Sequence, residues 1–198
     1  MQTLYGRPAP RKTQQLSEYD MEYFKKMKGT TKSPPTVSLS EIFWSWIGAF
    51  FGIGAVAFIN YNIFKGTDLV MIIGSFGASA VLIYGAIRSP LAQPRNLIGG
   101  HIISAIVGVT IYKLLHNQMW LAAAVAVATA IAIMHATRTL HPPGGATALI
   151  AVIGSPKVHN LGYLYAVIPA GLGAVIMLLI AVLINNIPAN RQYPEYWF

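Results

Sequence analysis

The residues that could bind a ligand are concentrated in RTLHPPGGATALIAVIGS, residues 138–155. Two adjacent prolines cannot both lie inside a continuing helix, because each lacks an N–H and clashes one turn back. Proline is well tolerated in the first turn of a new helix. We therefore predict that one helix ends near Thr137–Leu140 and that another runs from Pro142 or Pro143 to about Ile153. The first N–H groups of the new helix would be free to bind an anion, aided by the helix dipole. These groups belong to Gly144, Gly145, Ala146 and Thr147.

A related segment occurs in the first half of the chain. GASAVLI at Gly77–Ile83 aligns with GATALIA at Gly145–Ala151, and each is followed by Ser-Pro, at Ser89 and Ser155. The offset between the copies is 66–68 residues. Two short, glycine-rich elements at corresponding places in two halves of a membrane chain indicate the binding site of a transporter. A proline–glycine kink between two packed membrane helices is the alternative interpretation.

We predict an anion site between the two helix starts. Glycine lets an ion approach the backbone amides closely because it has no Cβ, and hydroxyl groups add donors that can rotate. Each helix start contributes roughly half a positive charge. Hydrogen bonding between helices is the alternative role for the hydroxyls. The predicted substrate-binding residues are Gly74, Ser75, Gly77 and Ser79 on the first element and Arg138, His141, Gly144, Gly145 and Thr147 on the second.

Several further polar residues lie near these elements. Arg138 would cost about 3 kcal/mol at membrane depth on insertion scales, so it should either attract anions in a wet cavity or lie at the interface as a topology anchor. His101 and His135 are candidates for a proton-linked or path-lining role, since histidine titrates near neutral pH. Helix-packing hydrogen bonds are the alternative for both. Asn96 either caps the third long helix, the interpretation that we favour, or lines the path.

The composition indicates a membrane protein. Charged residues make up 10% of the 198 residues and hydrophobic ones 55%, whereas soluble domains carry about a quarter charged residues. The net charge of +8 does not indicate a nucleic-acid partner, because the basic residues gather in the first 32 residues and otherwise stand singly between apolar runs. Five histidines without cysteine give no convincing metal-ligand set, and no catalytic motif is present. We therefore predict no metal, no cofactor and no enzymatic activity.

The chain divides into three predicted parts. Residues 1–35 form a polar cytoplasmic tail, in which Leu16 to Gly29 make a short amphipathic helix at the lipid surface. A disordered tail is the alternative interpretation. Residues 36–186 form the transmembrane domain, and residues 187–198 form a C-terminal tail. The predicted helices are Ile42–Phe64, Leu69–Ile87, Leu97–Leu115, Met119–Thr137, Pro142–Ile153 and Leu161–Ile184, the last of them kinked at Pro169 and Gly171.

The distribution of basic residues favours six crossings. If all six helices cross, eleven Lys/Arg lie on the side of the N-terminus and three on the other; if the two short helices re-enter, the split is nine to five. Three crossings per repeat give the two halves opposite orientations. The predicted fold class is all-α integral membrane, with about six transmembrane helices in a 3+3 inverted repeat and two short or broken helices at about residues 74–87 and 142–153. Six helices in about 150 residues make a thin bundle, so we expect a homo-oligomer. Small residues at four-residue spacing, such as Ala124, Ala128 and Ala132, would let helices pack closely within the bundle or form the interface between protomers.

The run HPPGGATAL at His141–Leu149 resembles the signature of the HPP family of integral membrane proteins, and GSFGASAVL (Gly74–Leu82) and PRNLIGGH (Pro94–His101) extend the resemblance. The plastid and cyanobacterial branch of that family is associated with nitrite transport. The resemblance therefore implies a transporter or channel for a small inorganic anion, nitrite first, with membrane lipids around it. Because no transit peptide is evident, we expect a bacterial or cyanobacterial inner membrane, or a plastid membrane in a plant. The alternative function is a non-transporting scaffold or sensor whose N-terminal tail binds a partner.

Overall fold

The computed structural model describes residues 23, 25–67 and 69–198, and the chain divides into two units, residues 1–36 and 37–198. In the first unit, Tyr23, Lys25 and Lys26 are helical and exposed. Met27 and Lys28 form a turn and a bend just before Gly29, where the helix was predicted to end. Residues 16–22 and 24 of the predicted helix lie outside the described residues. The second unit contains all of the elements discussed below.

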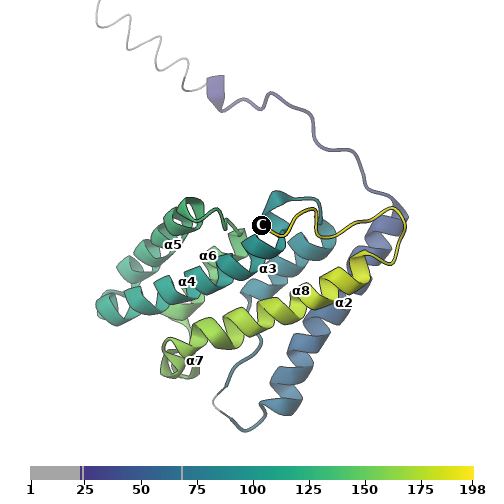
Figure 1. The fold of residues 1–198 in the computed structure, drawn as a ribbon. Coiled ribbons are helices and arrows are strands. Elements are labelled where there is room, and N and C mark those ends of the chain that lie inside the picture. The colour runs from purple at the N-terminus through teal and green to yellow at the C-terminus, as the bar shows by residue number, and fades with distance from the viewer. Residues whose placement is uncertain (1–22, 24, 68) are drawn as a thin grey trace, which may run out of the picture. The chain divides into compact units, whose positions relative to one another are not determined.

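The second unit is built from helices, and no strand occurs among the described residues (Figure 1). Two of the helices end in a wider, π-helical turn, and the last one begins with such a turn. In order, the elements are α2 (Leu39–Phe58, extended by Ile59–Ile63), α3 (Ser75–Ala80, extended by Val81–Gly85), α4 (Pro94–Leu115), α5 (Met119–Ala136), α6 (Pro142–Ile153), α7 (Pro156–Leu161) and α8 (Leu172–Asn185, preceded by Ala166–Gly171).

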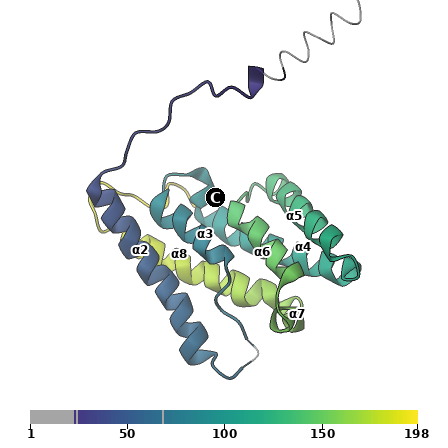
Figure 2. The same ribbon diagram turned by 180° about the vertical axis from the view of Figure 1, so that it is seen from behind.

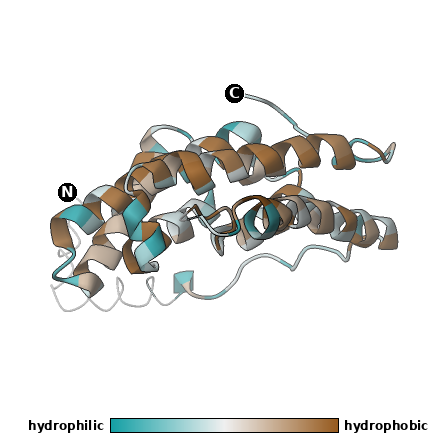
Figure 3. Cartoon of the chain, turned by 90° about the horizontal axis from the view of Figure 1, so that it is seen from below, coloured by the Kyte–Doolittle hydropathy of each residue, from teal (hydrophilic) through white to brown (hydrophobic). Residues whose placement is uncertain are grey.

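In the described part of the chain, four helices are long and apolar enough to cross a membrane: Leu39–Ile63, Pro94–Leu115, Met119–Ala136 and Ala166–Asn185. Figure 3 shows long hydrophobic stretches on the helices of the chain. The two remaining apolar helices, Ser75–Gly85 and Pro142–Ile153, are shorter. They are the two elements that the sequence predicts to be short or broken.

The second predicted helix, Leu69–Ile87, begins later than expected. Residues 69–73 are not helical, and helix α3 starts only at Ser75. The side chain of Asn60 holds this lead-in, because its Oδ1 accepts hydrogen bonds from the amides of Met71 (3.0 Å) and Ile72 (3.3 Å). Because these two amides are hydrogen bonded to Asn60, residues 69–73 can remain non-helical without leaving them unsatisfied.

The proline-based predictions for the second half are confirmed. Helix α5 ends at Ala136 and α6 runs from Pro142 to Ile153, with proline in its first turn. Between them Arg138 adopts the left-handed conformation, with φ of 56°. The last span kinks before Pro169, where Ile168 is extended (φ −130°, ψ 118°).

Helix α4 lies at the centre of one half of the bundle and contacts α5, α6 and the kinked segment before α8, while α2 packs against α8 and α3. Small residues make several of these contacts close. On α5 the buried stripe is Ala122, Ala126 and Ala130, each 0% exposed. The stripe beginning at Ala124 and Ala128 faces outward, so its predicted role in packing within the chain is wrong.

Candidate functional site

The two short helices lie side by side in opposite directions (Figure 2). Ser75, at the start of α3, is hydrogen bonded to Thr147, in the second turn of α6. One turn further along α3, Ser79 is hydrogen bonded to His141, the residue that precedes α6. The start of each helix therefore lies against the side of the other, and the two do not face each other end to end.

Five polar side chains from three helices form one hydrogen-bonded network at this crossing. His101 of α4 connects the side chains of α3 with those of α6. The His101 Nε2 lies 2.7 Å from Ser79 Oγ, and the His101 Nδ1 lies 2.7 Å from Thr147 Oγ1. Ser79 Oγ also lies 2.9 Å from His141 Nε2, and Thr147 Oγ1 donates to Ser75 Oγ at 2.9 Å. Each of the five side chains is at most 1% exposed. We call these residues the hydroxyl–imidazole network: Ser75, Ser79, His101, His141 and Thr147.

The spacing of these residues explains why they meet. Ser75 and Ser79 are four residues apart and share one face of α3. Helix α4 can approach α6 closely because Gly100 and Gly144 lie at the contact. A Cβ on Gly144 would lie 2.7 Å from Ser104 Oγ and 2.9 Å from the Gly100 carbonyl. The structure thus gives Gly144 a role in helix packing.

The segment before α6 is held by the start of α4. Asn96 Nδ2 donates to the Leu140 carbonyl at 2.8 Å, and Arg95 donates to the Thr137 carbonyl at 2.8 Å. His141 Nδ1 donates to the carbonyl of Leu91, in the turn before α4, at 2.8 Å. Asn96 therefore orients the lead-in to α6. The favoured prediction that it caps α4 is wrong, because Gln93 occupies the N-cap position.

The structure brings together only part of the predicted site. Gly74 and Gly77 are exposed, and a Cβ on Gly77 would meet nothing within 4 Å. Arg138 and His135 are also exposed and take no part in the network. Gly145 is half-buried, near Val127. The network members among the predicted residues are Ser75, Ser79, His101, His141 and Thr147.

The backbone amides that were predicted to be free are in part engaged. The Gly144 amide donates to the His141 carbonyl at 2.8 Å. At the start of α3, the amides of Phe76 and Gly77 donate to the carbonyls of Ile73 (3.0 Å) and Gly74 (3.2 Å). Hydroxyl and imidazole groups, which the helix-start argument treated as secondary, therefore make the polar centre.

Three contacts around the network were not predicted. The Phe76 ring meets His101 edge-on at 5.2 Å between centroids, and the Tyr165 hydroxyl donates to the Thr147 carbonyl at 3.2 Å. The third is the carbonyl of Leu91, which fixes His141. No sequence signal identifies a backbone carbonyl as a partner. Ser104, one turn after His101 on α4, donates to Met134 Sδ at 3.6 Å and makes no hydrogen bond to the network in the described part of the chain.

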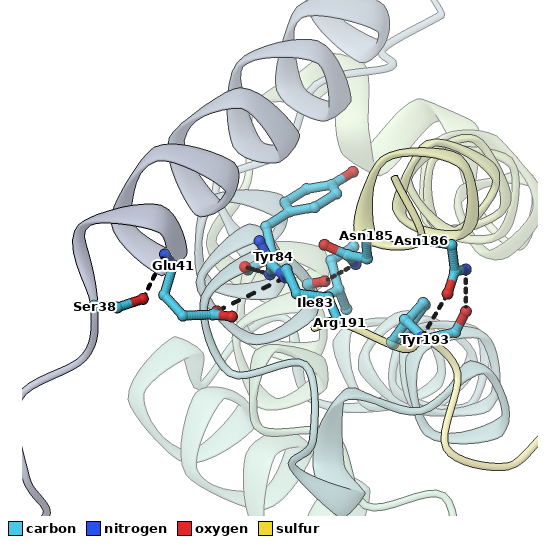
Figure 4. Close-up of polar contacts among 8 residues, drawn as sticks. All are labelled: Ser38, Glu41, Ile83, Tyr84, Asn185, Asn186, Arg191 and Tyr193. Atoms are coloured by element: carbon cyan, nitrogen blue, oxygen red, sulfur yellow. Dashed lines mark hydrogen bonds and ion pairs between the residues drawn. The ribbon is translucent and has the colours of Figure 1, made fainter. Parts of the chain in front are cut away.

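A second polar cluster joins the C-terminal segment to α2 and α3 (Figure 4). Arg191 is 5% exposed; its Nη2 donates to the Tyr84 carbonyl at 2.6 Å, and its Nε lies 3.7 Å from Glu41 Oε2. Burial lowers the pKa of Arg191, and the charge of Glu41 opposes that shift. Asn186 and Tyr193 exchange two hydrogen bonds, and the Tyr193 hydroxyl donates to the carbonyl of Ala92 at 2.6 Å. The segment thus reaches the turn whose Leu91 carbonyl binds His141.

Apolar spans, two short helices and a closed polar centre define a multi-pass helical membrane protein. Residues 34–194 match the family described as "HPP, transmembrane region". The chain belongs to the HPP family. It is 46% identical over 183 residues to a transmembrane protein of Dictyostelium discoideum, a match that covers 91% of this chain and 58% of that protein. A second transmembrane protein of the same organism is 46% identical over 188 residues, 92% of this chain and 66% of that protein. The chain thus spans about three fifths to two thirds of these relatives. No solved structure matches.

Proposed function

We propose that this protein transports a small inorganic anion across the membrane, and that the hydroxyl–imidazole network lines its path. The observation that carries the proposal is the burial of five polar side chains where the two short helices meet α4 in a strongly apolar chain. Polar and ionisable groups inside a membrane are expensive, so where they occur they are by default candidates for a functional site.

The chemistry of the network suits a small anion that has lost its water. Ser75, Ser79 and Thr147 carry hydroxyls that can turn toward an ion, and each imidazole can donate a ring N–H. In the closed arrangement these donors satisfy one another. An anion would replace the link between Thr147 and Ser75, where two hydroxyls meet, and accept the hydrogen bonds that they now share.

The arrangement of the short helices supports a 3+3 inverted repeat as part of this proposal. Helices α3 and α6 are the second elements of the two triplets α2–α3–α4 and α5–α6–α8, and they run in opposite directions. Opposed discontinuous helices at the repeat interface are typical of transporter sites. We propose that both cross the membrane, with residues 1–36 on the cytoplasmic side in agreement with the excess of basic residues there.

Nitrite is the first anion to test, because the resemblance to the plastid and cyanobacterial HPP branch implies it. The proposed location in a bacterial, cyanobacterial or plastid membrane rests on the same resemblance, whereas the relatives reported above come from Dictyostelium discoideum. The proposal predicts uptake by the purified protein in sealed liposomes.

The experiment compares tracer or stopped-flow uptake of nitrite, nitrate, formate and chloride into proteoliposomes. Protein-free liposomes correct for neutral nitrous acid that crosses the lipid unaided. Thr147→Val removes a hydroxyl of the network, and Thr129→Val makes the same change on α5 outside it. We expect nitrite uptake by the wild type and the Thr129 variant and a loss in the Thr147 variant. Absence of uptake in the wild type would reject transport and favour a scaffold, and equal uptake in both variants would reject this site.

A further inference from the structure

The contact of His141 with the carbonyl of Leu91 determines which atoms of the network carry hydrogens when both histidines are neutral. A carbonyl oxygen only accepts hydrogen bonds, so the contact of 2.8 Å requires a hydrogen on His141 Nδ1. If His141 is neutral, its Nε2 carries a lone pair and must accept from the Ser79 hydroxyl, 2.9 Å away. Ser79 then has no hydrogen left for His101.

The hydrogen positions of His101 follow from this requirement on Ser79. Its Nε2, 2.7 Å from Ser79 Oγ, must carry the hydrogen and donate. Its Nδ1 then carries a lone pair and accepts from the Thr147 hydroxyl at 2.7 Å. In this neutral arrangement every donor points from Thr147 toward Leu91.

One added proton reverses the direction of the hydrogen bonds between Thr147 and His141. A doubly protonated His141 donates from Nε2 to Ser79, Ser79 donates to His101 Nε2, and His101 Nδ1 donates to Thr147. The Thr147 hydroxyl is then free to donate to Ser75 Oγ at 2.9 Å or to the Pro143 carbonyl at 3.3 Å. The two arrangements differ by a single proton and need no movement of heavy atoms.

We propose that the hydroxyl–imidazole network relays one proton between His101 and His141 and that this proton accompanies the transported anion. The proton arrives at His101 Nδ1, the Nε2 proton of His101 passes to Ser79 Oγ, and the hydroxyl proton of Ser79 passes to His141 Nε2. The ring of His101 returns to neutrality in its other tautomer, and His141 holds the charge. The relay thus conserves every atom and moves one positive charge from one ring to the other.

The surroundings of the network favour a positive charge on a histidine only while an anion is bound beside it. The titratable groups at the network are His101, His141 and Tyr165, whose hydroxyl donates to the Thr147 carbonyl. Among the described residues no Asp, Glu, Lys or Arg side chain hydrogen bonds to any of the five. An isolated charge in such a place is costly, and a proton that neutralises a monovalent anion removes that cost. The coupling, though not the relay, rests on the proposed function.

The transport test of the coupling uses nitrite and a pH gradient. Proteoliposomes with an alkaline interior and no membrane potential should accumulate nitrite about tenfold for each pH unit, with acidification of an internal dye. Ser79→Ala keeps both histidines and interrupts the relay, so we expect gradient-driven uptake to fall about tenfold or more. Thr129→Val is the control. Nitrite uptake by the wild type without acidification would overturn the coupling and leave anion transport standing.

A second measurement tests the relay without transport. Ring-nitrogen NMR of histidine-labelled protein in liposomes reports the tautomer of each imidazole, and His101→Gln and His141→Gln variants assign the signals. We expect His101 to change from the Nε2–H to the Nδ1–H form as His141 becomes doubly protonated on acidification. A His101 that stays in one tautomer while His141 titrates would overturn the relay, even if nitrite transport had failed.

Discussion

The Ser79 hydroxyl contacts both histidines of the network. Ser79→Ala is therefore the substitution whose effect on the free energy of unfolding tests the network most directly. It removes contacts of 2.7 Å to His101 and 2.9 Å to His141 and leaves two buried ring nitrogens without a partner. A buried polar group left unsatisfied costs about 1–3 kcal/mol. Hydrogen bonds between membrane helices contribute on average only about 0.6 kcal/mol each. We therefore expect the free energy of unfolding to fall by about 1 kcal/mol at the least and about 6 kcal/mol at the most.

Ser104→Ala is the matched control for this prediction. Ser104 is also 0% exposed and one turn from His101, but its hydroxyl donates to Met134 Sδ, a weak acceptor, at 3.6 Å. Reversible unfolding of both variants in mixed detergent micelles, against the wild type, measures the difference. We expect Ser79→Ala to be the more destabilising. Equal losses in the two variants would refute the view that the network is a set of mutually satisfied hydrogen bonds.

Three further outcomes are expected. Gly144→Ala should lower the free energy of unfolding by about 1–3 kcal/mol through overpacking, because its Cβ would lie 2.7 Å from Ser104 Oγ. Gly77→Ala, with nothing within 4 Å, should not lower the free energy of unfolding and should leave nitrite uptake unchanged. A loss of uptake in Gly77→Ala would favour the predicted anion site made of backbone amides. Tyr193→Phe removes the hydrogen bond to the Ala92 carbonyl and should lower the free energy of unfolding by about 1 kcal/mol. It should also speed hydrogen exchange in residues 87–93. Unchanged exchange would contradict a stabilising contact between the C-terminal segment and this turn. Asn60→Ala should speed hydrogen exchange at the Met71 and Ile72 amides, which unaltered rates would contradict.

The sequence predicted the helix boundaries best where proline decides them. The limits of α6 and the kink before Pro169 follow from the missing N–H and the steric clash of proline. The lead-in to α3 escaped prediction, because a short apolar run such as residues 69–73 reads equally well as helix or as extended chain. Only the hydrogen bonds from Asn60, a residue of another element, distinguish the two.

The members of the site were predicted better than its chemistry. Ser75, Ser79 and Thr147 were chosen as hydroxyls of the two helix starts. His141 was chosen as the residue at the break before the second helix, and His101 was placed nearby. The predicted anion site nevertheless relied on free amides at the helix starts. Helix α5 shows a related limit. Alanine occurs on all of its faces, so spacing alone could not tell the buried Ala126 from the exposed Ala128.

The account depends on an anion entering the network beside Ser75. Because the chain has no native cysteine, a Ser75→Cys variant in proteoliposomes offers a single thiol there, and Gly77→Cys offers an exposed one two residues away. The measurement is the rate at which a small charged thiol reagent labels each variant, with and without nitrite. The account predicts that nitrite slows labelling at position 75 and leaves position 77 unchanged; equal rates with and without nitrite at position 75 would contradict it.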